Sequence, residues 1–378
     1  MNHRCHSLGI LILWVTALIY FVTVLGQLKP PKLPPENLIA GYTMANEIPI
    51  VNFYVDDTNN GEETHFRFSM AYINTFMKSF NKKIDKIRSF LRRNQNEESD
   101  VQQQQIKRLP HNDWFYFAVN KYEHAINNSK VVVFGSMEPF AEVAALALGA
   151  AHVSTVEYNN LTINHSSIST FSKFDFSTIY DCEGKYVGSY DVGISLSSFD
   201  HDGLGRYGDP LDPEGDLKAM SRAWMLLKPS GLLFLTVPIG SDLVVFNLLR
   251  RYGRVRLPLL LRHWEVVEKL FWEEDKLYQD PAGTSFRRSY EPVLVLRKPA
   301  AAAGAGAFRS LDEAPTGSGK LSIQVEEEQP MHRCTPKTYE EDDDKNIRMQ
   351  QLVDTKSHDS NMADTSTATS TVSLEAEL

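Results

Sequence analysis

Residues 131–136 read VVVFGS, and residues 155–158 read TVEY. In the first stretch, the apolar residues 131–134 are followed by Gly135. In the second, the acidic residue Glu157 follows Val156. YDVGIS (190–195) and LLFLTVP (232–238) are further short apolar runs, a length typical of strands buried on both faces. An alanine-rich stretch ending at Gly149 and the segment 215–227 lie between them and have helical character. This alternation predicts a doubly wound α/β fold with a mostly parallel sheet.

Two more segments complete the predicted sheet. HWEVVEKLFW (263–272) and EPVLVLRKP (291–299) are strand-like and are separated by a polar loop. Such a pair is expected to be antiparallel and to close one edge of the sheet. Upstream, DWFYFAVNKYEHAI (113–126) has helical character. We therefore place the α/β domain at residues 112–299.

The N-terminal residues 1–27 predict a membrane anchor or a signal sequence. Residues 8–25 carry no charge, and eighteen such residues are just long enough to cross a bilayer. An uncleaved anchor gives a single-pass membrane protein of the secretory pathway, in the endoplasmic reticulum or Golgi, with its bulk outside the cytosol. A cleaved signal, with a small-residue site near Gly26, gives a secreted protein instead.

Residues 28–111 read as a Pro-rich spacer followed by a helical region. Apolar residues recur there at alternating spacings of three and four, at Met70, Ile73, Met77, Phe80, Ile84, Ile87 and Leu91. This stripe predicts a helix that packs on the main domain, with a dimeric coiled coil as the alternative. We expect a loop at the polar residues 102–105. Residues 300–378 predict a disordered, acidic, Ser/Thr-rich tail, with an interaction tail as the alternative.

Charge and cysteine content exclude several classes of protein. The chain has 39 basic and 48 acidic residues, and 15 of the acidic ones lie after position 299, so the body is nearly neutral. A neutral body argues against nucleic acid as the main partner, because phosphate binding needs a basic face. The three cysteines, Cys5, Cys182 and Cys334, are far apart and offer neither a disulfide framework nor a metal site.

The predicted strand ends bring together groups that suit a nucleoside cofactor. Gly135 and Ser136 follow the first strand, where a missing side chain lets a ligand approach and the next helix can present amide groups. Glu157 ends the second strand, where a carboxylate can accept both ribose hydroxyls. Ser198 follows the strand at 190–195. All three positions lie at the carboxyl edge of the sheet, where open α/β sheets bind ligands.

These segments resemble the successive motifs of class I S-adenosylmethionine-dependent methyltransferases. The resemblance rests on VVVFGS, TVEY, YDVGIS and LKPSGLLFLTVP, and it implies a seven-stranded sheet with a reversed last strand. SSFDHDGLGRYGDPLDPEGD (197–216) and PIGSDLVVFNLLRRYG (238–253) resemble, more narrowly, the largely nematode family called domain of unknown function 268. The wider resemblance implies S-adenosylmethionine as cofactor, with Gly135 in the cofactor loop, Glu157 on the ribose, and Ser198 to Asp202 beside the methyl group.

The loop that starts at His201 holds the candidate catalytic and substrate-binding residues. His201 and Asp202 are the predicted catalytic pair, in which the imidazole takes a proton from an acceptor hydroxyl. Arg206, Tyr207 and Asp209 are predicted to contact the acceptor. In the alternative interpretation, Asp202, Arg206 and Asp209 pair with one another and only hold the loop.

Arginines between positions 250 and 262 alternate with leucines and form a second candidate site. Arg250 is the residue predicted to bind a carboxylated or phosphorylated acceptor; the segment could also rest on anionic lipid or form a solvated helix face.

Two functions remain open at this stage. The first is a membrane-tethered O-methyltransferase that acts on a sugar, glycan or small polar acceptor. The second is a catalytically silent domain that keeps the fold for binding or scaffolding. The second is favoured by the cofactor loop, since Ser136, Met137, Glu138 and Pro139 replace most of the usual glycine pattern.

Overall fold

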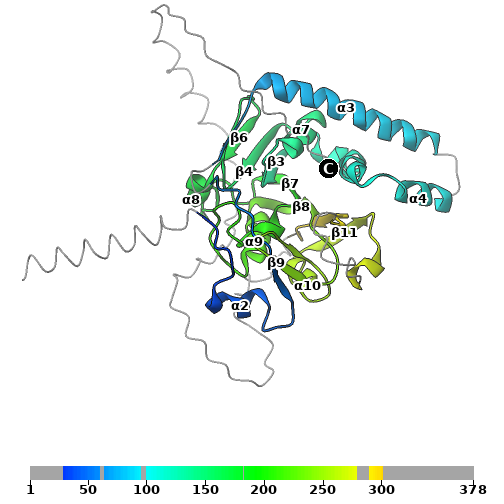
Figure 1. The fold of residues 1–378 in the computed structure, drawn as a ribbon. Helices are drawn as coiled ribbons and strands as arrows, with labels where there is room; N and C mark the ends of the chain where they lie inside the picture. Colours follow the sequence, from blue (N-terminus) through cyan, green and yellow to red (C-terminus); the bar gives the residue numbers. More distant parts are fainter. Residues whose placement is uncertain (1–28, 60–63, 95–98, 182, 279–288, 301–378) are drawn as a thin grey trace, which may run out of the picture. The chain divides into compact units, whose positions relative to one another are not determined.

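The computed structural model describes residues 29–59, 64–94, 99–181, 183–278 and 289–300, which include the α/β domain. Its central element is a seven-stranded sheet in the order β11-β12-β8-β7-β3-β4-β6 (Figure 1). The strands are β3 (Lys130–Phe134), β4 (His152–Val156), β6 (Ile168–Phe171), β7 (Tyr190–Leu196), β8 (Leu227–Thr236), β11 (Glu265–Leu270) and β12 (Val293–Arg297).

Strand directions agree with the sequence prediction. β3 is parallel to β4 and β7, β6 is parallel to β4, and β8 is parallel to β7. β12 runs antiparallel to both of its neighbours, β8 and β11. The doubly wound, mostly parallel sheet with one reversed strand is therefore confirmed.

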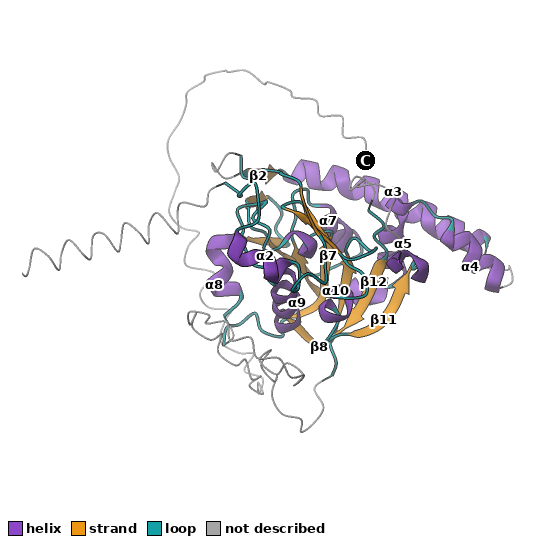
Figure 2. Ribbon diagram, turned by 60° about the horizontal axis from the view of Figure 1, so that its bottom comes forward, coloured by secondary structure: helices purple, strands orange, loops and turns teal. Residues whose placement is uncertain are grey.

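Helices cover both faces of the sheet (Figure 2). On β3, Val131 and Val133 belong to one core cluster, whereas Val132 and Phe134 belong to the other, because successive strand side chains point to opposite faces. The first face is covered by α3 (Met70–Arg93), α5 (Trp114–Lys121), α6 (Glu123–Ile126) and α7 (Phe140–Ala147). The second face is covered by α8 (Phe176–Ile179), α9 (Gly215–Leu226) and α10 (Arg256–Leu260).

Helix α3 buries most of its apolar stripe within this chain, although Met70 at its start is exposed. Ile73, Phe80, Ile84 and Ile87 are each at most 2% exposed and join the same core cluster as residues of α5 and α7. Ser69 is the N-cap of the helix, and its side-chain oxygen accepts a hydrogen bond from the backbone N–H of Tyr72. A coiled-coil seam would need the side chains that this packing already buries.

The residues before the α/β domain add short strands to it. β1 (Ile50–Asn52) pairs with β9 (Leu243–Phe246), which also pairs with β10 (Leu249–Arg251). β2 (His65–Phe68) pairs with β5 (Asn160–Ile163). α2 (Glu36–Tyr42) packs with β9 in a small separate cluster. The lead-in segment is thus bound to the sheet region at two places, which the composition of a Pro-rich spacer did not predict.

Three sequence predictions need comment here. Residues 102–105 are not a loop, since α4 (Ser99–Lys107) includes them. The membrane segment predicted at 1–27 and the disordered tail predicted at 300–378 lie outside the described residues, apart from Ala300. Among the helices that the structure describes, none combines the length and hydrophobicity needed to span a membrane.

Candidate active site

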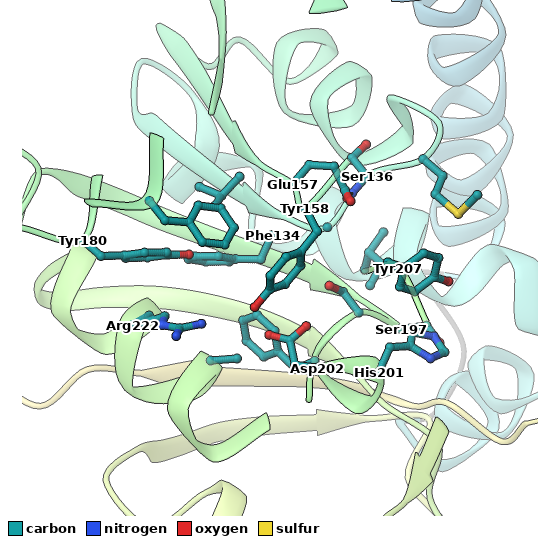
Figure 3. A pocket seen from close by; sticks show the side chains of 18 residues that line it. Phe134, Ser136, Glu157, Tyr158, Tyr180, Ser197, His201, Asp202, Tyr207 and Arg222 are labelled. Atoms are coloured by element: carbon teal, nitrogen blue, oxygen red, sulfur yellow. The ribbon is translucent and has the colours of Figure 1, made fainter. Parts of the chain in front are cut away.

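A cavity of about 230 Å³ lies at the carboxyl ends of β3, β4 and β7 (Figure 3). The chain passes from β3 to β4 on one side and returns from β6 to β7 on the other, so this edge is the switch point of the sheet. Ligands of doubly wound sheets bind at such points. The remaining wall comes from Phe176 of α8, from Tyr180 directly after that helix, and from Arg222 of α9.

Gly135 forms the turn that opens the cavity, as predicted. Its φ is +70°, a conformation that favours glycine. A Cβ atom at this position would lie 2.1 Å from the Ser198 hydroxyl oxygen, so the two loops can approach only because the side chain is absent. Ser136 follows and donates its hydroxyl to the carbonyl oxygen of Glu138 over 3.0 Å. The predicted residues Gly135, Ser136 and Ser198 therefore all line one end of the cavity.

Glu157 lies at the same end and is 7% exposed. Its Oε2 accepts a hydrogen bond of 2.6 Å from the backbone N–H of Ser136, and its Oε1 accepts two from Asn159, at 3.0 and 3.2 Å. Burial raises the pKa of the carboxyl, and these hydrogen bonds oppose that rise. The side chain thus links the ends of β3 and β4 and keeps an acidic group at the cavity wall.

His201 lines the cavity, but its ring nitrogens already have neighbours. Nδ1 lies 2.6 Å from the carbonyl oxygen of Leu248 and donates to it, which leaves Nε2 unprotonated in the neutral ring. Nε2 lies 3.4 Å from Oδ2 of Asp200. Burial and nearby Arg206 lower the pKa of His201 to about 4. An imidazole with so low a pKa is a weak general base at neutral pH.

Asp202 also lines the cavity, and its pKa is shifted in the opposite direction from that of His201. Burial, and then the neighbouring Asp209, hold the pKa of the Asp202 carboxyl well above its ordinary value. A carboxylate with a raised pKa accepts a proton more readily than an ordinary one. Of the two predicted catalytic residues, Asp202 has the more suitable electrostatic surroundings.

Asp200, next to His201 in the chain, is fully buried, and neither of its carboxyl oxygens has a hydrogen-bond partner among the residues that the structure describes. Burial raises its pKa to about 7, and burial together with Asp200 raises the pKa of Glu291 to about 7. The folded protein therefore holds a proton that an unfolded aspartate releases near pH 4. Stability from this site is present at low pH and falls as the pH rises from about 4 to about 7.

Asp200→Asn removes that titration. We expect the variant to match the wild type in stability at pH 4.5 and to exceed it by about 1–3 kcal/mol at pH 8. Urea denaturation of both proteins at a series of pH values measures the difference. A difference that does not change with pH would contradict the assignment.

The rest of the predicted substrate loop is mostly engaged in holding its own shape. Asp209 accepts hydrogen bonds from the backbone N–H groups of Gly203, Gly205 and Tyr207, at 2.7, 3.0 and 3.2 Å. Arg206 forms an ion pair of 2.6 Å with Asp57 of the lead-in segment. Only Tyr207 of the three predicted substrate-binding loop residues lines the cavity.

Arg250 is not part of the cavity or of a solvated helix face. It lies in β10, is 1% exposed, and donates to the carbonyl oxygens of Asp202, Asp212 and Pro213. Its Nε is 3.7 Å from Asp216, which also pairs with Arg256 at 2.6 Å. This buried network supports the loop from behind, so the sequence prediction of a substrate-binding Arg250 has no support in its position.

Sequence reasoning missed three polar residues at the other end of the cavity. Tyr180 and Arg222 lie at that end. Tyr158 extends toward them across the middle of the cavity, from its position next to Glu157 (Figure 3). Tyr158 follows the predicted ribose-binding acid directly, which could have marked it. Arg222 stands three residues after the buried Ala219 on α9, so helical periodicity could have placed it on the buried face.

Comparison with known families adds one assignment. The family described as "Caenorhabditis protein of unknown function, DUF268" matches residues 128–292. The match covers less than half of the chain. It contains β3 through β11, and with them the turn, the acid and the loop of the candidate site. No curated protein matches the chain.

Solved structures similar to this chain are distant. A Burkholderia thailandensis 1,6-didemethyltoxoflavin-N1-methyltransferase with bound S-adenosylhomocysteine is 14% identical, with 61% of this chain and 89% of that one covered and a TM-score of 0.34. A Mesorhizobium loti S-adenosylmethionine-dependent methyltransferase is 11% identical, with 48% and 97% covered and a TM-score of 0.30. The cyclase SpnF is 12% identical, with 48% and 80% covered and a TM-score of 0.29. At these scores no function follows for residues 128–292, and their fold is assigned from their own strand order.

Proposed function

We propose that this protein is an S-adenosylmethionine-dependent methyltransferase. The observation that carries the proposal is the buried Glu157 carboxylate at the end of β4, beside a turn that glycine alone can form. Both features lie at the switch point of the sheet, where a nucleoside can reach them.

The residues present fit an adenosyl cofactor. The Glu157 carboxylate already accepts hydrogen bonds from the backbone N–H groups of Ser136, Tyr158 and Asn159 and from the Asn159 side chain, so a ribose hydroxyl would share or replace one of these contacts. The cavity is smaller than the usual range of about 300–1,000 Å³, and a ligand must move a side chain. Met137, which lines the cavity and is 44% exposed, and Tyr158 can make that room.

The proposed reaction is O-methylation. When bound, S-adenosylmethionine supplies a sulfonium methyl group. Asp202 in its ionised form takes the proton of the acceptor hydroxyl, and the raised pKa of its carboxyl makes that carboxylate a stronger base. The carbonyl oxygen of Leu248 fixes the orientation of the neutral His201 ring beside Asp202, so His201 acts as a positioning residue of the same loop.

The acceptor and the setting are part of the same proposal. A small polar acceptor, such as a sugar or glycan hydroxyl, suits a cavity lined by Ser197, Ser198 and Tyr207. Tethering to a membrane of the secretory pathway is supported by the uncharged residues 8–25. Both proposals stand on sequence and lining chemistry alone.

A silent binding or scaffolding domain is the second candidate. It is favoured by the small cavity, by Tyr158 within it, and by a His201 whose ring nitrogens face Leu248 and Asp200. In that case the fold persists without cofactor chemistry.

Thermal denaturation of the full chain with S-adenosylhomocysteine separates the two candidates. At a ligand concentration of about 100 Kd, binding adds about 2.7 kcal/mol to the folding free energy, so we expect a clear rise in Tm. Adenine alone at the same concentration is the control. A folded protein whose Tm does not change in millimolar S-adenosylhomocysteine would contradict the methyltransferase proposal.

A further inference from the structure

Arg222 is the guanidinium among the residues that line the cavity. It projects from α9 at the end away from Ser136 and Glu157 (Figure 3). Its neighbours are the hydroxyl of Tyr158, with which it forms a hydrogen bond, and the ring of Tyr180, whose centroid lies 5.3 Å from its Cζ. The site so far described gives this residue no role.

The charge of Arg222 has no ion-pair partner among the described residues. Burial disfavours the charged guanidinium, but the nearby tyrosine hydroxyls raise its pKa above the ordinary value, so it stays charged. Asp202 is its acidic neighbour and interacts with it only at longer range. A charge that is removed from water without a carboxylate or phosphate partner is costly to the folded protein. A ligand anion would offset that cost.

The surrounding surface is aromatic. Tyr158 packs edge-on against Phe176 at 5.0 Å, and Phe176 packs edge-on against Tyr180 at 5.4 Å. Phe134 and Phe199 also line the cavity, with their ring centroids 5.3 Å apart. Such walls accept a flat ring by stacking or edge contacts. A flat body with an anionic group at one end fits both the walls and the guanidinium.

We propose that Arg222 binds the carboxylate of a small acceptor that has a flat, unsaturated ring. A guanidinium matches a carboxylate through two parallel N–H to oxygen hydrogen bonds, which a neutral group cannot form. The role of that ligand as methyl acceptor rests on the proposed function and makes the small polar acceptor named there a flat carboxylate instead of a sugar, whereas the binding of a carboxylate at Arg222 does not rest on it. S-adenosylmethionine also carries a carboxylate, so the experiment must separate the two sources.

Benzoate is the probe for the acceptor, and benzamide is its neutral counterpart of the same shape. Titration calorimetry of the full chain, without cofactor, is expected to show benzoate binding and no benzamide binding. Arg222→Gln should weaken benzoate binding at least about tenfold, because it removes a charged hydrogen bond. Arg222→Lys keeps the positive charge but lacks the two parallel donors of the guanidinium. Its affinity for benzoate should lie between those of the wild type and Arg222→Gln. Arg93→Gln, at an exposed position on α3, is the control and should bind like the wild type.

Two nucleosides test the other source. S-adenosylhomocysteine has the amino-acid carboxylate, and 5′-methylthioadenosine lacks it. We expect both to bind Arg222→Gln as they bind the wild type. If only S-adenosylhomocysteine loses affinity, Arg222 holds the cofactor carboxylate; if both lose affinity, it contacts the nucleoside. Either result would overturn the acceptor assignment.

The benzoate result is independent of the cofactor. If neither nucleoside binds the wild type, the proposed function fails, while benzoate binding that depends on Arg222 still supports the anion site. If the wild type does not bind 10 mM benzoate, or binds benzamide equally well, the anion site is wrong. If Arg222→Gln does not fold, the anion site is tested by benzoate and benzamide binding to the wild type and by benzoate binding to Arg222→Lys.

Discussion

Asp216→Ala is expected to lower the free energy of unfolding by about 3–5 kcal/mol, because it leaves buried positive charge without its partner. Asp216 is fully buried and accepts hydrogen bonds from Arg256 at 2.6 and 2.8 Å and from the Tyr252 hydroxyl at 2.9 Å. Burial alone would raise its pKa, but Arg250 and Arg256 bring it below the ordinary value. The carboxylate is therefore a charged member of the core.

Urea denaturation at pH 7 measures this loss. Glu265→Ala is the matched control, since it breaks the exposed ion pair with Arg297, which is worth at most about 1 kcal/mol. The midpoint should fall far more for Asp216→Ala than for the control. Equal small losses would show that the buried network contributes little, and the support it gives to the loop of Asp202 would have to be reconsidered.

Glu157→Ala is expected to weaken the binding of S-adenosylhomocysteine about 30-fold or more. A hydrogen bond to a charged group contributes about 1.5–3 kcal/mol, and each 1.4 kcal/mol is a tenfold change in affinity. The substitution also removes the acceptor for the Ser136 N–H, so the turn at Gly135 loses a contact. Titration calorimetry of variant and wild type gives the two affinities.

Two further variants separate the ribose contact from the support of the turn. Asn159→Ala removes one donor to Oε1 but keeps the carboxylate, and we expect an affinity within about threefold of the wild type. Glu157→Asp keeps the charge but withdraws it by one methylene, and its affinity should be intermediate. If Glu157→Ala binds as tightly as Asn159→Ala, the carboxylate does not contact the ligand.

The sheet could be predicted because its strands are local and nearly fully apolar. VVVF, TVEY, YDVGIS and LLFLTVP became β3, β4, β7 and β8, and the reversed pair at the end became β11 and β12. β1 could not be found in this way. Its three residues carry little signal, and the pairing of Ile50 with Val244 depends on contact across nearly 200 positions. α4 was missed because polarity suggested a loop, although glutamine is a good helix former.

For the site as well, residues set by a local strand could be predicted, and residues brought together by packing could not. Gly135 and Glu157 could be recognised because a strand ends just before or at each of them, and the strand itself sets their place. Arg250 was misplaced, since an arginine among leucines reads as a surface residue until its carbonyl partners are known. Arg222 and Tyr158 reach the cavity from α9 and from the end of β4. Their convergence depends on how the helix packs on the sheet, which no single segment encodes.

A crystal structure of the full chain with S-adenosylhomocysteine tests the central claim most directly. We predict the ribose hydroxyls within hydrogen-bonding distance of Glu157, the turn at Gly135 against the amino-acid portion, and a displaced Met137 or Tyr158. A cavity that stays closed by those side chains, with the ligand absent or bound elsewhere on the protein, would contradict the account.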